Sequence, residues 1–220
     1  TSNLELAEFL KEASGRLEGF GSVNLSKDEA YVEGKLKEID RLGFKGIKLL
    51  PPLQFLRPAF KDNLRILFEY CEGRKKIILF HTGCAPGPWE IPELSEAANP
   101  TLLRPLLEEF HPVVVLAHAG YYSALLPGIW FEEALQVGKE YPNVYLEVSA
   151  VPYILADERL ATLVRRRVPF DRILYGSDYI EYMELSINII KQSAWTSGEE
   201  KQKILSLNAE RLLSETSAAV

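Results

Sequence analysis

Cysteine is scarce in this sequence. The chain has two cysteines, Cys71 and Cys84, and they form neither a CxxC motif nor a disulfide framework. Such sparse cysteine use is typical of proteins from a reducing compartment. We therefore expect a cytoplasmic protein whose stability does not depend on disulfide bonds.

Long apolar runs and a surplus of positive charge are also absent. No apolar run approaches the roughly 18 to 20 residues that cross a bilayer, and no signal-peptide pattern opens the chain. The net charge is −6, whereas phosphate binding requires a surplus of Lys and Arg. We expect neither a membrane nor a nucleic-acid partner. A small-molecule substrate is the expected partner, with a homodimer as an open alternative to a monomer.

What is present is the composition of an ordinary globular protein. Hydrophobic residues make up 47% of the chain and charged residues 25%. A chain of 220 residues can bury one good core, and no linker, internal repeat or low-complexity segment divides it. The sequence predicts one domain over residues 1–220.

Short apolar segments alternate with helical patterns along the chain. The predicted strands cover residues 17–24, 46–50, 77–83, 113–120, 144–149 and 173–178. This alternation predicts an α/β fold with a parallel sheet and helices outside it. Ser26 with Glu29, and Ser197 with Glu200, predict capping boxes at the start of two helices. Three arginines, 165–167, predict a solvated end for another helix.

The number of strands leaves two architectures open. Six units make an open sheet, whereas eight close a (β/α)8 barrel, which typically takes about 250 residues. The chain begins at Thr1 without a methionine and runs directly into a helical pattern. We expect an incomplete TIM-barrel-like domain that lacks two amino-terminal units, with a gap between the strands at 17–24 and 173–178.

Three of the apolar segments deliver a polar side chain at the same end. His81 follows an apolar run, His118 follows the next one, and Asp178 ends the last strand. The carboxyl ends of parallel strands are where α/β folds place their chemistry. Each residue also has a structural interpretation, as a hydrogen-bonded histidine or a helix cap. Their equivalent positions favour one shared site, whereas His111 lies at the opposite end of its strand.

These residue types suit a divalent metal. Imidazole nitrogen and carboxylate oxygen are zinc ligands, so His81, His118 and Asp178 are the candidate metal ligands. A metal-bound water has a lowered pKa and acts as a nucleophile. Asp178 and His118 are the candidate catalytic residues, Asp178 by accepting the proton of that water and His118 by orienting it.

Four further residues are candidates for substrate binding. Lys48 and Glu147 lie at strand ends, where they either bind substrate or form an ion pair with each other. Trp89 and Tyr121 belong to segments that follow the two histidine strands, where loops carry specificity, and Tyr122 beside Tyr121 is also expected in the apolar wall. Aromatic core packing is the alternative for all three.

A set of motifs along the chain resembles a known family. These motifs are GFKGIKL (43–49), ILFHTG (78–83), VVLAHAG (114–120), VYLEVS (144–149), ILYGSDY (173–179) and NAERLL (208–213). Together they resemble the amidohydrolase superfamily, in the amidohydrolase-2 branch that includes aminocarboxymuconate semialdehyde decarboxylase. The resemblance implies a metal-dependent (β/α)8 barrel. It also implies that His81 and Asp178 bind the metal, and that His118 contacts the metal-bound water or a second metal.

The chain departs from the pattern of that family in two places. The family carries a His-x-His pair on its first strand, and this sequence has no such pair; by the family order it starts at the third strand. Leu50 stands where relatives often have histidine. With at best three ligands, we expect weak metal binding, and some relatives with lactonase activity work without metal.

The sequence thus predicts a metal-dependent hydrolase or a non-oxidative decarboxylase. Its substrate is expected to be small and to carry a carboxylate or a ring, and its metal is expected to be zinc. Two alternatives stay open: a metal-independent lactonase, and a non-catalytic truncated barrel that serves as a binding or assembly module.

Overall fold

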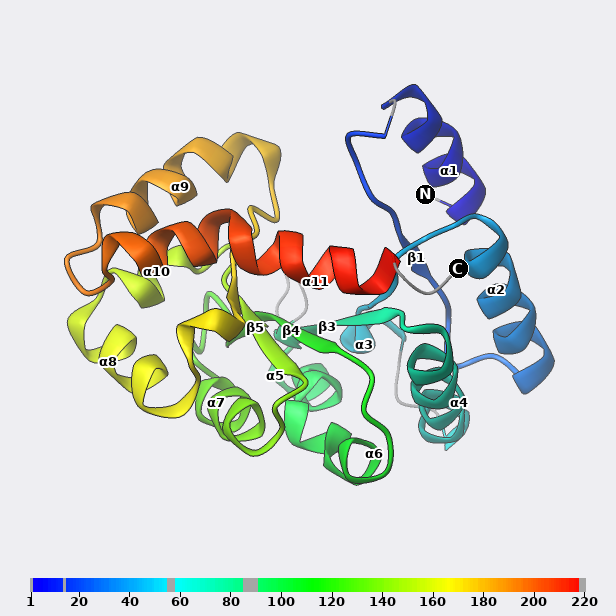
Figure 1. Cartoon of the computed structure of the whole chain (residues 1–220). Coiled ribbons are helices and arrows are strands. Elements are labelled where there is room, and N and C mark those ends of the chain that lie inside the picture. The colour runs from blue at the N-terminus through cyan, green and yellow to red at the C-terminus, as the bar shows by residue number, and fades with distance from the viewer. Residues whose placement is uncertain (1, 14, 55–57, 85–90, 218–220) are drawn as a thin grey trace.

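The computed structural model contains one six-stranded sheet in which every pairing is parallel (Figure 1). It describes residues 2–13, 15–54, 58–84 and 91–217. The strands are β1 (Phe20–Ser22), β2 (Gly46–Leu49), β3 (Ile77–Gly83), β4 (Val114–Tyr122), β5 (Val144–Glu147) and β6 (Ile173–Leu174). They pair in chain order, so the predicted α/β fold with a parallel sheet is confirmed.

Helices alternate with these strands as the sequence predicts. The α-helices are α1 (Asn3–Glu12), α2 (Glu29–Arg41), α3 (Pro51–Gln54), α4 (Pro58–Arg74), α5 (Pro92–Ser95), α6 (Arg104–Glu109), α7 (Phe131–Glu140), α8 (Glu158–Arg167), α9 (Met183–Gln192), α10 (Gly198–Gln202) and α11 (Asn208–Ser217). Short 3-10 turns are η1 (Glu96–Ala98), η2 (Pro100–Leu103), η3 (Pro152–Leu155), η4 (Phe170–Arg172) and η5 (Ile180–Tyr182), and η6 (Lys203–Leu207) is a π-helical turn. No helix within the described ranges has the length and apolarity needed to span a membrane.

Helix starts follow the sequence signals with one exception. Ser197 and Glu200 form the predicted capping box of α10. At α2 the predicted box is wrong, because Asp28 is the N-cap and accepts a hydrogen bond from the backbone N–H of Tyr31. The Ser26 hydroxyl donates instead to the carbonyl oxygen of Gln54, far along the chain.

The sheet is buried on both faces, as runs of apolar residues in parallel strands predict. The larger core lies between the strands and the helices α2, α4 and α7. The other face carries a smaller cluster of Ile77, Val115, Tyr145 and Leu174, which Leu212 of α11 covers. Figure 1 shows α11 on one side of β3–β5, with α6 and α7 on the other. The last helix of the chain therefore covers one face of its sheet.

The edge strand β6 is joined to that last helix by hydrogen bonds. The backbone N–H of Tyr175, just after β6, donates to the carbonyl oxygen of Ile204 at 3.0 Å. Ile204 lies in the π-helical turn η6, where backbone hydrogen bonds join residues five apart instead of four. The side chain of Asn208 donates to the carbonyl oxygens of Phe170 and Ile173, both at 2.8 Å. These contacts cover an edge that would otherwise expose unpaired backbone groups.

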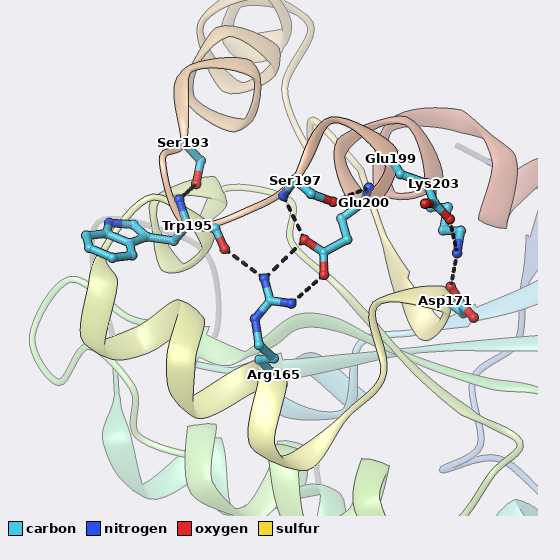
Figure 2. A network of polar contacts seen from close by, with 8 residues as sticks. All are labelled: Arg165, Asp171, Ser193, Trp195, Ser197, Glu199, Glu200 and Lys203. Carbon is cyan, nitrogen blue, oxygen red and sulfur yellow. Dashed lines mark hydrogen bonds and ion pairs between the residues drawn. The ribbon is translucent and has the colours of Figure 1, made fainter.

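Ion pairs join α8 and the η4 turn to the carboxyl-terminal helices (Figure 2). Arg165 of α8 donates to the Trp195 carbonyl oxygen at 2.8 Å and to both carboxylate oxygens of Glu200. Lys203 bridges Asp171 and Glu199, each at 2.9 Å. Arg165 makes these contacts at the surface, and Arg165 and Arg166 are exposed, as the predicted solvated helix end requires. Such half-exposed pairs contribute little, about 0 to 1 kcal/mol each.

Asn208 is expected to matter more for stability than these ion pairs. Asn208→Ala removes two hydrogen bonds to backbone carbonyl groups from a side chain that is only 3% exposed. We expect the free energy of unfolding to fall by about 2–4 kcal/mol. Urea denaturation measures it, with Glu210→Ala at an exposed position of the same helix as the control. A loss equal to that of the control would contradict this role.

Candidate active site

Side chains from four parts of the chain line one cavity at the carboxyl ends of the strands. The cavity has a volume of about 100 Å³, and its lining comprises Lys48 and Leu50 from the end of β2, His81 of β3, His118 and Tyr122 of β4, and Asp178 and Tyr179 after β6. The three predicted metal ligands and the predicted lysine therefore meet in one place. Their roles there stay predictions.

A local irregularity between β3 and β4 brings the two histidines together. His81 pairs with Ala117 and Gly83 with Tyr122, so the single residue Thr82 faces residues 118–121. The hydroxyl of Thr82 donates to the Ala117 carbonyl oxygen at 2.5 Å and accepts from the Gly120 N–H at 2.7 Å. The extra residues of β4 form a bulge, within which His118 lines the cavity. As a result, the ring centroids of His81 and His118 lie 4.8 Å apart.

Two of the three candidate ligands have a left-handed backbone. His118 has φ 63°, Ala119 has φ 48° and Asp178 has φ 65°. This conformation costs roughly 1–2 kcal/mol for a residue other than glycine. Such strain persists only where the surrounding structure enforces it, and it is concentrated at functional sites. The strain therefore supports the choice of His118 and Asp178 as site residues on grounds independent of the sequence pattern.

His81 is a neutral, buried imidazole. It is 2% exposed, and its Nε2 lies 2.7 Å from the carbonyl oxygen of Cys84. Burial, and then the neighbouring His118 and Lys48, hold the pKa of His81 well below its ordinary value. Because a carbonyl oxygen only accepts, Nε2 carries the ring proton and Nδ1 keeps its lone pair.

His118 has the opposite tautomer. Its Nδ1 lies 3.0 Å from the carbonyl oxygen of Ser149, so Nδ1 is the donor, and in the neutral ring Nε2 keeps the lone pair. The ring of Tyr122 lies 5.0 Å from that of His118, centroid to centroid. The two histidines thus offer different nitrogens with free lone pairs.

Lys48 brings a cation to the same cavity. Its side chain is half-buried in β2, and burial lowers its pKa, whereas the negative charges of Glu147 and Asp178 act in the opposite direction. Asp178 itself is exposed to solvent. A cation next to two histidines can bind an anionic group of a substrate.

Not all of the remaining predicted residues line the cavity. Tyr121 packs against Phe131 and Tyr153, with ring centroids 5.1 and 5.7 Å away, whereas Tyr122, predicted for the same wall, does line the cavity. Adjacent residues of a strand point to opposite sides, so only one of the two tyrosines faces the cavity. Trp89 lies outside the described residues.

Glu147 is buried next to His118, and its carboxylate is hydrogen-bonded to protein groups. It accepts hydrogen bonds from the N–H and hydroxyl groups of Ser149, both at 2.7 Å. Sequence reasoning missed Ser149, although its polar side chain two positions after Glu147, at the end of an apolar strand, was a usable signal.

A larger depression lies away from the strand ends. It measures about 700 Å³ and is lined by charged residues of α7 and α8, among them Glu132, Asp157 and Arg166. It is a shallow feature of the outer helical layer and contains none of the side chains described above. The smaller cavity is therefore the candidate active site.

The donor types around this cavity suit a metal, but their arrangement is incomplete. Two imidazole nitrogens and one carboxylate are ligands that zinc and manganese accept. However, within the part of the chain that the structure describes, no group of three or more His, Cys, Asp or Glu side chains is arranged to hold a metal ion. Leu50 also contributes an apolar wall where a ligand would help. The described residues alone therefore do not fit a closed metal cage.

We expect this chain to bind zinc weakly. With fewer than four protein ligands and a lysine cation nearby, the dissociation constant should be no tighter than about 1 µM. Titration calorimetry with ZnCl₂ measures it, with His81→Ala to test the site and His111→Ala as the matched control. Nanomolar binding that His81→Ala abolishes would contradict the expectation.

Comparison with known proteins supports the family and the fold. No curated protein matches the chain significantly. Among solved structures, an uncharacterised TIM-barrel protein from Bordetella bronchiseptica is 24% identical, with a TM-score of 0.72 over 99% of this chain and 73% of that chain. A putative 2-pyrone-4,6-dicarboxylic acid hydrolase from Pseudomonas putida is 20% identical, with a TM-score of 0.66 over 97% and 78%. A dihydroxybenzoic acid decarboxylase from Polaromonas, with bound manganese and the inhibitor 2-nitroresorcinol, is 14% identical, with a TM-score of 0.66 over 96% and 73%.

These similarities confirm a TIM-barrel-like α/β fold, of which the described residues form six parallel strands. The model of the amidohydrolase family matches residues 1–214, which is nearly the whole chain. The motifs at 78–83, 114–120 and 173–179 that suggested this family are those that place His81, His118 and Asp178 around one cavity. The chain belongs to the amidohydrolase family, in its amidohydrolase-2 branch.

Proposed function

We propose that this chain forms the active site of a cytoplasmic hydrolase or non-oxidative decarboxylase that acts on a small cyclic or aromatic carboxylate. One observation carries the proposal: Lys48, His81, His118 and Asp178 line the same cavity at the carboxyl ends of the strands. This combination offers an anion-binding cation, two imidazoles and a carboxylate. Structural neighbours include both a hydrolase and a decarboxylase, which supports the two reaction types equally.

Lys48 binds the carboxylate of the substrate in this proposal. Its ammonium group is half-buried, so its attraction for an anion is screened less than at the surface. The cavity of about 100 Å³ admits one small group rather than a large ligand. Because burial lowers the pKa of Lys48, carboxylate binding should be lost at a lower pH than with an exposed lysine as the pH rises.

His118 and Asp178 perform the proton transfers. For hydrolysis, Nε2 of His118 or the Asp178 carboxylate takes a proton from water as the water oxygen bonds to the carbonyl carbon of an ester or lactone. The bond from that carbon to the leaving oxygen then breaks, and the leaving oxygen takes the proton back from the same group. For decarboxylation, the bond to the carboxylate carbon breaks, carbon dioxide leaves, and the ring carbon keeps the electron pair and takes a proton from the protonated form of one of these groups. Both routes require the two residues to face the substrate.

A divalent metal, zinc as the sequence predicts or manganese as in the Polaromonas neighbour, would polarise the substrate and lower the pKa of a bound water. His81, His118 and Asp178 are the ligands that this chain would contribute. The steps above use protein groups alone, since the described residues do not form a closed metal cage.

A panel of dihydroxybenzoate isomers and 2-pyrone-4,6-dicarboxylate tests the proposal. The chain is assayed by ultraviolet absorbance and carbon dioxide release, with MnCl₂, ZnCl₂ or EDTA. Lys48→Met should weaken the binding of whichever compound is turned over by about 10- to 100-fold, as expected for the loss of a charge-assisted contact. Lys37→Met, at an exposed position of α2, is the control. Absence of turnover and of carboxylate binding in every condition would favour the non-catalytic alternative.

A further inference from the structure

A buried carboxylate behind His118 has no role in the scheme above. Glu147, at the end of β5, is 8% exposed, and its two oxygens accept three hydrogen bonds. Oε1 accepts from the N–H of Ser149 at 2.7 Å, and Oε2 accepts from the hydroxyl of Ser149 at 2.7 Å and from the N–H of His118 at 3.3 Å. A buried carboxylate is tolerated only when its oxygens are satisfied in this way.

These bonds determine what the Ser149 hydroxyl offers to His118. The hydroxyl has one proton, which it donates to Glu147, so its oxygen can only accept from another group. Its oxygen lies 2.9 Å from Nδ1 of His118, and the Ser149 carbonyl oxygen lies 3.0 Å from the same nitrogen. Both atoms of Ser149 that face the ring are therefore acceptors.

We propose that Ser149 and Glu147 form a positioning pair that keeps the ring proton of His118 on Nδ1 and leaves Nε2 unprotonated for the cavity. Glu147 does not bind substrate; it acts on His118 through the hydroxyl of Ser149. The catalytic meaning of the pair rests on the proposed function, but the tautomer itself does not. This assignment replaces the predicted substrate-binding role of Glu147.

The packing around Glu147 shows that this arrangement is tightly defined. A Cβ atom at Gly176 would overlap Oε1 of Glu147, so the segment after β6 passes directly against the carboxylate. Ser149 is 5% exposed, and Ala150 after it has a left-handed backbone with φ 58°. The backbone at Gly176 therefore packs directly against the carboxylate that accepts from Ser149.

A purely structural role, in which Glu147 only ties β5 to β4, predicts that substitution leaves the tautomer of His118 unchanged. The positioning role predicts that the tautomer changes. In Glu147→Gln, the amide oxygen best accepts from the Ser149 N–H, which places the amide NH₂ against the Ser149 hydroxyl. The hydroxyl then accepts from that amide, and its own proton is free to point at Nδ1 of His118. This favours the other tautomer of His118, with the proton on Nε2.

The tautomer is read directly by NMR of the chain labelled with ¹⁵N in its histidine rings, in EDTA at neutral pH. His81→Gln and His111→Gln identify the signals, because the chain has three histidines. The wild type should show His118 with its proton on Nδ1. Glu147→Gln should shift the ratio of tautomers towards Nε2 by about tenfold, the value of one hydrogen bond near 1.4 kcal/mol. Adding Ser149→Ala to Glu147→Gln should restore the Nδ1 form, because only the carbonyl acceptor remains.

Three results would overturn the proposal. They are a wild-type His118 protonated on Nε2, an unchanged tautomer in Glu147→Gln, and a double variant that stays shifted. The wild-type spectrum decides the first without any substitution, so the proposal remains testable if a variant fails to fold. Because no substrate is used, failure of the proposed function would leave this result unaffected.

Discussion

Replacing His118 with glutamine is expected to reduce turnover by about 10² to 10⁴-fold, the usual contribution of a positioned acid–base group. The substitution removes Nε2, the ring nitrogen left free by the contact between Nδ1 and Ser149. It removes no positive charge that binds the carboxylate, since that role belongs to Lys48. We therefore expect kcat to fall while KM changes little, measured with the active compound of the substrate panel.

His111→Gln is the matched control for this substitution. His111 has a side chain that is 71% exposed and lies next to Glu72, at the end of β4 opposite the cavity. It should retain wild-type turnover. If His118→Gln keeps more than about a tenth of the activity, or if both variants lose it equally, His118 is not the catalytic group assigned here.

Gly120→Ala is expected to be among the most destabilising single changes in the chain. Gly120 has φ 75°, and a Cβ atom there would overlap the backbone carbonyl of Trp130. The Trp130 N–H also donates to the Gly120 carbonyl oxygen at 3.0 Å, so neither segment can move independently. Left-handed strain of about 1–2 kcal/mol and overpacking of about 1–3 kcal/mol together predict a loss of about 2–5 kcal/mol. This is a large part of the total stability of a typical domain.

Gly43→Ala separates the two contributions. Gly43 has nearly the same backbone angle, φ 73°, but a Cβ atom there meets nothing within 4 Å. Its substitution should cost only the backbone strain, about 1–2 kcal/mol. Urea denaturation of both variants isolates the overlap with Trp130 as their difference. Equal losses would show that the close approach at Gly120 does not constrain the turn that carries His118.

Much of this site could be predicted from local pattern. Strands that alternate with helices bring their carboxyl ends to one edge, and this pattern alone predicts that Lys48, His81, His118 and Asp178 lie close together, as they do. The matched positions of the two histidines after their apolar runs predict that they lie close together, although the two residues do not pair with each other across β3 and β4. His81 pairs with Ala117, and the bulge in β4 turns His118 towards the cavity.

Other features depend on contacts that no local pattern contains. Ser26 precedes α2 like a capping residue, but its hydroxyl is bound to Gln54, and Asp28 takes over the cap. Of the two tyrosines predicted for the cavity wall, Tyr122 lines the cavity and Tyr121 packs against Phe131. The strand end of Glu147 predicts either substrate binding or an ion pair, whereas the hydrogen bonds from Ser149 to its carboxylate could not be predicted from that position alone.

The measurement that tests the central claim most directly is the titration of the ¹⁵N-histidine chain with 2,6-dihydroxybenzoate. If one cavity joins Lys48, His81 and His118, the ring signals of both histidines should shift together with a single dissociation constant. The signal of His111 should stay in place, and Lys48→Met should weaken the binding by about 10- to 100-fold. Shifts of His111 alone, different dissociation constants for His81 and His118, or no dependence on Lys48 would contradict the account.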